Sequence, residues 1–151
     1  MRIRVIVPIT SPDFNEMCSI EAKTFLSDEA EVDVVSLTHG PASIESYYDE
    51  ILAAPHIVEA VQKAEDDGIE GVFITCFGDP GVDAARELVD IPVVGGFQPA
   101  VSLALTLGDR FGIVTVLDNV VPMIHDLVAK MGVTSRMASV RVIDKIGRAH
   151  V

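Results

Sequence analysis

The feature that most constrains the fold is a regular alternation between short apolar runs and longer segments with helical spacing. Four runs rich in Val or Ile occur at Ile3–Ile9, Glu31–Leu37, Gly71–Thr75 and Ile91–Val94. Such runs are typical of strands in a parallel sheet, which helices cover on both faces. Parallel neighbours must be joined by crossovers, and these are right-handed. The sequence therefore predicts an α/β fold with a doubly wound, parallel, four-stranded sheet over residues 1–96.

The segments between these runs are predicted to be helices. The first, Asp13–Leu26, has an apolar face that we expect to pack in the core. That face consists of Phe14, Met17, Cys18 and Phe25. The second, Ile44–Asp67, should break near Pro55. The third should open with Asp79 as its N-cap and Pro80 at its first helical position.

After residue 96 the same pattern starts again but stops early. The predicted order is helix, strand, helix, strand, at Pro99–Leu107, Phe111–Leu117, Val120–Met131 and Val140–Asp144. A sheet of two parallel strands is marginal, so we interpret residues 97–145 as an incomplete second α/β domain and the chain as truncated. Residues 146–151 carry no periodic element, and the hexapeptide is what the start of a common sequencing adapter encodes. We expect these six residues to be a non-native tail.

Charge and cysteine content exclude several classes of function. A formal charge of −12 should repel nucleic acid and anionic membranes. The two cysteines lack the spacing of a secreted disulfide framework, and no segment has the roughly 18 apolar residues of a membrane span. We therefore expect a cytoplasmic protein whose partner is a small-molecule substrate. The four histidines lack metal-ligand spacing and no phosphate-binding glycine loop is present, so neither a metal nor a cofactor is expected.

The candidate for chemistry is Cys76, which directly follows the third predicted strand. In open α/β sheets, ligands bind beyond the carboxyl ends of strands, near the point where the strand order reverses. The end of the first strand, Pro8–Ser11, and the loop around Ser43 should reach the same crevice. A helix that starts just after Cys76 would favour the thiolate and lower the pKa from about 8.5 toward neutrality. The alternative is a small buried hydrophobic residue, the role we assign to Cys18.

Several segments are similar to those of a known family. They are Cys-Phe-Gly-Asp-Pro-Gly at 76–81, Ile-Pro-Val-Val-Gly at 91–95, Gly-Pro-Ala-Ser-Ile-Glu-Ser at 40–46, Tyr-Asp-Glu at 48–50 and Arg-Phe-Gly-Ile-Val-Thr at 110–115. Together they resemble the aspartate/glutamate/hydantoin racemase superfamily, nearest its hydantoin racemase branch, over residues 1–145. The resemblance implies that the first unit is a flavodoxin-like racemase domain.

The resemblance also implies a mechanism without a cofactor or metal. Such enzymes place two cysteines on opposite faces of a carbon acid, so that one thiolate removes the α-proton and the other thiol returns one. Cys76 would be the first thiol, and the backbone N–H groups of Phe77 and Gly78 would stabilise the enolate-like charge. The other substrate-binding candidates are Pro8, Thr10, Ser43 and Thr115.

This chain departs from the family pattern in three places. Val-Pro-Ile-Thr stands at 7–10, where hydantoin racemases usually have Asn-Pro-Asn-Thr, and Phe-Gln-Pro-Ala at 97–100 replaces a frequent glutamate–alanine pair. The equivalent of Cys76 in the second unit falls near position ~184, beyond Val151. We therefore expect this chain not to racemise alone, and the full-length protein to be a homo-oligomer.

The predicted function is racemisation of a hydantoin or an amino-acid derivative. The first alternative is an aspartate or glutamate racemase, a maleate isomerase or an arylmalonate decarboxylase. Aspartate and glutamate racemases tend to have Asn-Thr after the first cysteine, whereas this chain has Phe77-Gly78, which favours a larger and less charged substrate. The second alternative is a non-catalytic domain that binds a small molecule.

Overall fold

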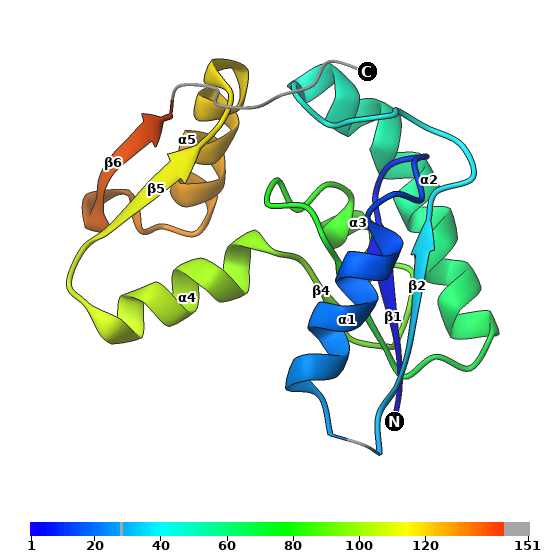
Figure 1. Cartoon of the computed structure of the whole chain (residues 1–151). Coiled ribbons are helices and arrows are strands. Elements are labelled where there is room, and N and C mark those ends of the chain that lie inside the picture. Colours follow the sequence, from blue (N-terminus) through cyan, green and yellow to red (C-terminus); the bar gives the residue numbers. More distant parts are fainter. Residues whose placement is uncertain (28, 144–151) are drawn as a thin grey trace.

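A four-stranded parallel sheet forms the first lobe of the protein (Figure 1). The structure is a computed structural model and describes residues 1–27 and 29–143; the tail predicted at 146–151 lies outside the described residues. The strands are β1 (Arg2–Val7), β2 (Glu31–Ser36), β3 (Gly71–Ile74) and β4 (Val93–Val94). They lie in the order β2-β1-β3-β4 and every neighbouring pair is parallel. The predicted doubly wound α/β sheet is confirmed, and its order reverses between β1 and β3.

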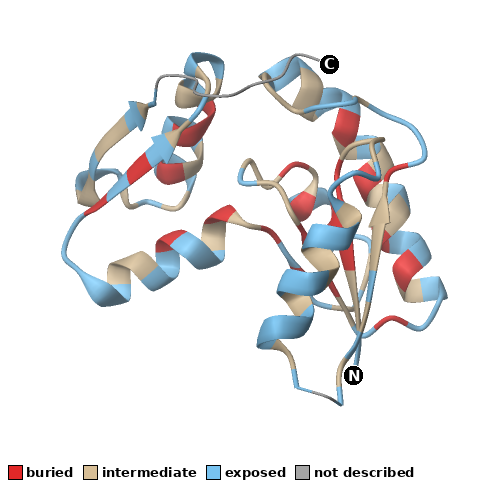
Figure 2. Cartoon of the chain, viewed as in Figure 1, coloured by how far each residue is buried: buried red, intermediate tan, exposed pale blue. Residues whose placement is uncertain are grey.

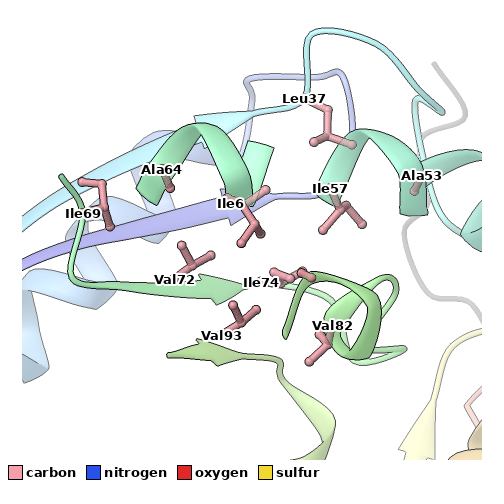
Figure 3. Packing of buried hydrophobic residues seen from close by; sticks show 12 residues of the cluster. Ile6, Leu37, Ala53, Ile57, Ala64, Ile69, Val72, Ile74, Val82 and Val93 are labelled. Carbon is pink, nitrogen blue, oxygen red and sulfur yellow. The ribbon is translucent and has the colours of Figure 1, made fainter. Parts of the chain in front are cut away.

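One face of this sheet carries the main core, which α2 (Tyr47–Asp66) and α3 (Val82–Arg86) cover. Ile6 of β1 is paired with Ile74 of β3, and both side chains point toward Ile57 of α2 (Figure 3). None of the three is exposed to solvent. Burying each such side chain contributes about 1.5–3 kcal/mol, so this layer fixes the position of the strand ends that follow it.

The helix α1 (Asn15–Phe25) lies over the opposite face and buries none of its own residues (Figure 2). The prediction that its apolar face packs in the core is wrong: Met17 is 50% exposed and Phe25 is 87% exposed. Phe14, Met17 and Cys18 instead line an open hollow beside β1 and β3. The spacing correctly predicts a helix, but it does not show that the space facing the helix is only partly filled.

Two local predictions about helices also differ from the structure. The helix α2 continues through Pro55 without a break, although the ring removes one backbone donor. Asp79 does not cap a following helix; it has a left-handed backbone with φ of 49°, and α3 begins only at Val82, after Gly81 with φ of 70°. The carboxylate of Asp79 instead accepts hydrogen bonds from the N–H groups of Phe97 and Gln98.

The second lobe has its own sheet and its own core. The strands β5 (Phe111–Thr115) and β6 (Met137–Val142) pair in parallel. They are accompanied by α4 (Phe97–Leu107), α5 (Val121–Lys130) and two 3-10 turns, η1 (Asp118–Val120) and η2 (Thr134–Arg136). The buried side chains that pack together in its core are Phe97, Val101, Phe111, Ile113, Ile124 and Val128. These elements form a two-stranded parallel α/β unit. Within residues 1–27 and 29–143, no helix is both long and apolar enough to cross a bilayer.

Candidate active site

Cys76 lies at the carboxyl end of β3, at the point where the strand order reverses. Thr75 extends the pairing with β1, because its backbone N–H donates to the carbonyl of Ile6 at 3.0 Å and its hydroxyl donates to the same oxygen at 3.4 Å. The carbonyl of Cys76 then accepts a hydrogen bond from the Asp79 N–H at 3.2 Å, which closes a tight turn. The thiol is thus held, half-buried, at the edge of the sheet.

Two cavities meet at Cys76. The smaller has a volume of about 230 Å³ and lies between the cysteine loop and the second lobe, with Glu50 and Thr115 among its lining residues. The larger has a volume of about 460 Å³ and is the open hollow below α1, with Pro8 and Cys18 in its lining. Phe77 lines both cavities together with Cys76. The thiol can therefore face a ligand in either space.

The structure brings most of the predicted site residues together. Cys76, Phe77, Gly78 and Thr115 line the smaller cavity, and Pro8 lines the larger one. Thr10 and Ser43 are absent from the lining of both. Thr10 donates its N–H to the carbonyl of Pro41 at 3.1 Å, which joins the end of β1 to the loop that carries Ser43, and Ser43 itself is exposed. These two predicted contacts stay predictions.

The environment of the Cys76 thiol favours its neutral form. Burial is the main cause that raises the pKa of this thiol to about 11. A hydrogen bond from the Gly78 backbone lowers the pKa, whereas the charges of Glu50 and Asp79 raise it further. The predicted fall of the pKa toward neutrality is wrong in direction. No helix begins directly after the thiol, and two carboxyl groups lie close to it.

Glu50 is a site residue that the sequence analysis missed, although it belongs to the Tyr-Asp-Glu segment at 48–50. Its Oε1 atom is buried and has no hydrogen-bond partner among the described residues. A methyl group at position 78 would overlap Oε1 and lie 3.7 Å from Sγ of Cys76, so the carboxyl and the thiol meet over Gly78. Burial, and then the charge of Asp79, raise the pKa of Glu50 to about 7.

The start of α2 explains why Glu50 points into the site. Ser46 is the N-cap, and its Oγ accepts a hydrogen bond from the Asp49 N–H at 3.3 Å. The carboxylate of Asp49 in turn accepts from the Ser46 hydroxyl at 2.8 Å and from the Glu45 N–H at 3.0 Å. Asp49 is therefore occupied in capping the helix. The next residue, Glu50, lines the cavity beside the cysteine loop.

The cavity wall on the side of the second lobe is fixed by several contacts. The carboxylate of Asp79 accepts hydrogen bonds from the N–H groups of Phe97 at 2.8 Å and Gln98 at 3.1 Å. The rings of Phe77 and Phe97 meet edge to face with 5.0 Å between centroids. The Tyr47 hydroxyl donates a hydrogen bond to Asp126 of α5. The space beside Cys76 is therefore enclosed by elements of both lobes.

The groups in this space suit proton transfer. They are a thiol, a carboxyl group and a hydroxyl, from Cys76, Glu50 and Thr115, among otherwise mainly apolar side chains. Of the described residues that line the two cavities, none is Lys or Arg. In the described part of the chain, no cluster of three or more His, Cys, Asp and Glu side chains could hold a metal ion.

Similar proteins of known family cover nearly the whole chain. Residues 3–151 match the family model described as Asp/Glu/Hydantoin racemase. A hydantoin racemase of a Pseudomonas species is 42% identical over 141 residues, which are 93% of this chain and 57% of that protein. The solved structure of an allantoin racemase from Klebsiella pneumoniae matches with a TM-score of 0.91 at 34% identity, over 95% of this chain and 59% of that one.

A maleate isomerase from Pseudomonas putida has the same fold at 10% identity, with a TM-score of 0.66 over 96% of this chain and 64% of that one. The chain thus spans less than two thirds of the length of these relatives. The family match nevertheless covers both lobes and the cysteine loop between β3 and α3. The chain therefore belongs to the Asp/Glu/hydantoin racemase family.

Proposed function

We propose that this chain supplies Cys76 as one proton-transferring thiol of a racemase that acts on a hydantoin or a related amino-acid derivative. The observation that carries the proposal is the position of Cys76, half-buried at the reversal point of the sheet and facing a cavity enclosed by both lobes. The similarity to a hydantoin racemase and to an allantoin racemase supports this substrate class. Hydantoin and allantoin share one ring system, which has an acidic C–H beside a carbonyl.

The reaction requires one proton to leave and one to arrive. The Cys76 thiolate takes the proton of the α-carbon, and the electron pair of the broken C–H bond moves onto the neighbouring carbonyl oxygen. Backbone N–H groups of Phe77 and Gly78 are the candidates to hold that oxygen. A second thiol on the opposite face then gives its proton to the carbon. With a pKa of about 11, only about one Cys76 thiol in 10⁴ is ionised at pH 7, but the thiolate is a strong base once formed.

Cys18 is the other cysteine of the chain, and it lines only the larger cavity. It does not face the space that holds Glu50 and Thr115. We therefore expect the 151-residue chain to exchange the α-proton from one face of the substrate, without converting one enantiomer into the other.

Proton exchange tests this proposal directly. Single enantiomers of a 5-substituted hydantoin are incubated with the chain in D₂O at pH 7, beside a protein-free blank, and the C5–H signal and the optical rotation are followed. We expect one enantiomer to lose the signal while its rotation is retained. Cys76→Ser should abolish the exchange and Cys18→Ser, the matched control, should leave it unchanged. Exchange that persists in Cys76→Ser, or complete racemisation by the unchanged chain, would contradict the proposal.

An enzyme for dicarboxylates, such as an aspartate or glutamate racemase or a maleate isomerase, is the alternative within the family. The absence of Lys and Arg from the described lining of both cavities, and the carboxyl groups beside Cys76, disfavour it. A non-catalytic binding domain is the other alternative. It predicts that Cys76→Ser keeps its affinity for the ligand and that the unchanged chain shows no exchange.

A further inference from the structure

In the described part of the chain, Oε1 of Glu50 is the one buried side-chain oxygen or nitrogen without a hydrogen-bond partner. This oxygen packs against Gly78 beside the Cys76 thiol, and the Glu50 residue lines the smaller cavity. Buried polar atoms are nearly always hydrogen-bonded, because an unpaired one loses its contacts with water and gains nothing in return. A ligand that brings a hydrogen-bond donor to this point would remove that cost.

The surroundings of Glu50 define which ligand can do so. Apart from Cys76, Glu50 and Thr115, the side chains that line the cavity are apolar. Asp79 lies near enough for its charge to act on both Glu50 and Cys76. A carboxylate ligand would meet this negative field with no cationic side chain in the described lining to offset it. An uncharged ring with N–H donors meets no such repulsion.

We propose that Glu50 recognises the substrate by accepting a hydrogen bond from a ring N–H of an uncharged cyclic ureide, and thereby disfavours dicarboxylates. This inference rests on the proposed function, since it assigns a further substrate contact to the same site. The carboxyl group holds the ring N–H while Cys76, on the same side of Gly78, faces the adjacent α-carbon. A carboxyl group keeps one acceptor oxygen whether or not it is protonated, so the contact is available in both forms.

Ligand affinity in three variants tests the role of Glu50. The dissociation constant of 5-methylhydantoin is measured by NMR titration of the 151-residue chain, and Tm is recorded for each variant. Glu50→Leu removes the acceptor and should weaken binding by about 10- to 100-fold without lowering Tm. Glu50→Gln keeps an acceptor oxygen and should lose less than Glu50→Leu. Glu59→Leu, an exposed carboxylate on the same helix outside both cavities, is the matched control and should bind unchanged.

Methylated ligands provide a test that needs no variant. The N1-methyl and N3-methyl derivatives of 5-methylhydantoin each lack one donor, and the unchanged chain should bind at least one of them about 10-fold more weakly than the parent. Equal affinity for all three ligands overturns the inference, even if Glu50→Leu fails to fold.

The remaining outcomes separate this inference from the proposed function. If Glu50→Leu binds 5-methylhydantoin as tightly as the unchanged chain, Glu50 does not contact the substrate. The proposed function would still stand if exchange of the α-proton depends on Cys76. If aspartate binds more tightly than 5-methylhydantoin, the assigned substrate class is wrong. If the unchanged chain binds no hydantoin at all, both proposals fall.

Discussion

Asp79 and Phe97 join the cysteine loop to the second lobe: one carboxylate oxygen of Asp79 accepts a hydrogen bond from the Phe97 N–H at 2.8 Å. Its other oxygen accepts from Gln98 at 3.1 Å. These are the first free N–H groups of α4, and the residue at its N-cap, Gly96, has no side chain to satisfy them. Asp79 thus caps a helix of the other lobe, and the same carboxylate acts on the Cys76 thiol. The shape of the loop and the attachment of the lobe are linked through one side chain.

Removing the Asp79 carboxylate should therefore weaken the attachment of α4. We expect Asp79→Ala to lower the free energy of unfolding by about 1–2 kcal/mol, because two N–H groups lose their acceptor. Asp79→Asn keeps an acceptor and tolerates the left-handed backbone, so its loss should be smaller. Urea unfolding of both variants measures the difference, with exposed Asp90→Ala as the control. Equal stability of Asp79→Ala and the unchanged chain would show that the cap contributes nothing.

Gly95 leaves the space that the Asp79 carboxylate occupies. A methyl group at position 95 would overlap both carboxylate oxygens, whereas a methyl group at Gly108 would meet only a carbonyl oxygen at 3.6 Å. We expect Gly95→Ala to destabilise the protein by about 1–3 kcal/mol and Gly108→Ala to have little effect. The cost of Gly95→Ala should shrink when Asp79 is already Ala, because the overlap is then gone. Additive losses in urea unfolding of the double variant would exclude this overlap as the cause.

The parts of the fold that were predicted correctly depend on local patterns. The β-branched run around Ile6 and the run that ends at Ile74 indicate buried strands by themselves. Cys76 could be placed at the reversal point because strand order in such sheets follows general rules of connection. These inferences need only neighbours in the sequence and the handedness of crossovers.

The parts that were missed depend on contacts between distant segments. Asp79 followed by Pro80 has the local form of a helix start, yet its carboxylate is drawn to Phe97, in the other lobe. Glu50 is one of several acidic residues near the start of α2, and the sequence does not distinguish it from the others. Its position over Gly78, known only from the fold, identifies it as the site residue. The direction of the Cys76 pKa follows first from burial of the thiol and then from these two carboxyl groups, so it could not be predicted before the packing around the thiol was known.

The charge of Glu50 should control the reactivity of Cys76. Glu50 ionises near pH 7, and its negative charge then raises the pKa of the thiol. We expect iodoacetamide to alkylate Cys76 faster in Glu50→Gln than in the unchanged chain between pH 8 and 9. At pH 5 the two rates should be nearly the same, because residue 50 is then uncharged in both proteins. Iodoacetamide labelling read by peptide mass spectrometry measures the rate, with Cys18 as an internal reference. A rate difference that is the same at every pH would contradict control by this charge.

The same carboxyl group should make stability depend on pH. The pKa of Glu50 is raised from 4.5 to about 7 on folding, so the folded protein holds this proton more tightly than the unfolded chain does. The resulting stabilisation is fully present below pH 4.5 and is lost as the pH rises through 7. We therefore expect Tm of Glu50→Gln minus Tm of the unchanged chain to increase from pH 4.5 to pH 8, with most of the change between these two pKa values. Scanning calorimetry across this range measures the difference, and Glu59→Gln, an exposed neighbour on α2, is the control. A difference in Tm that stays constant with pH, or that matches the control, would mean that Glu50 ionises in the folded protein as it does in the unfolded chain.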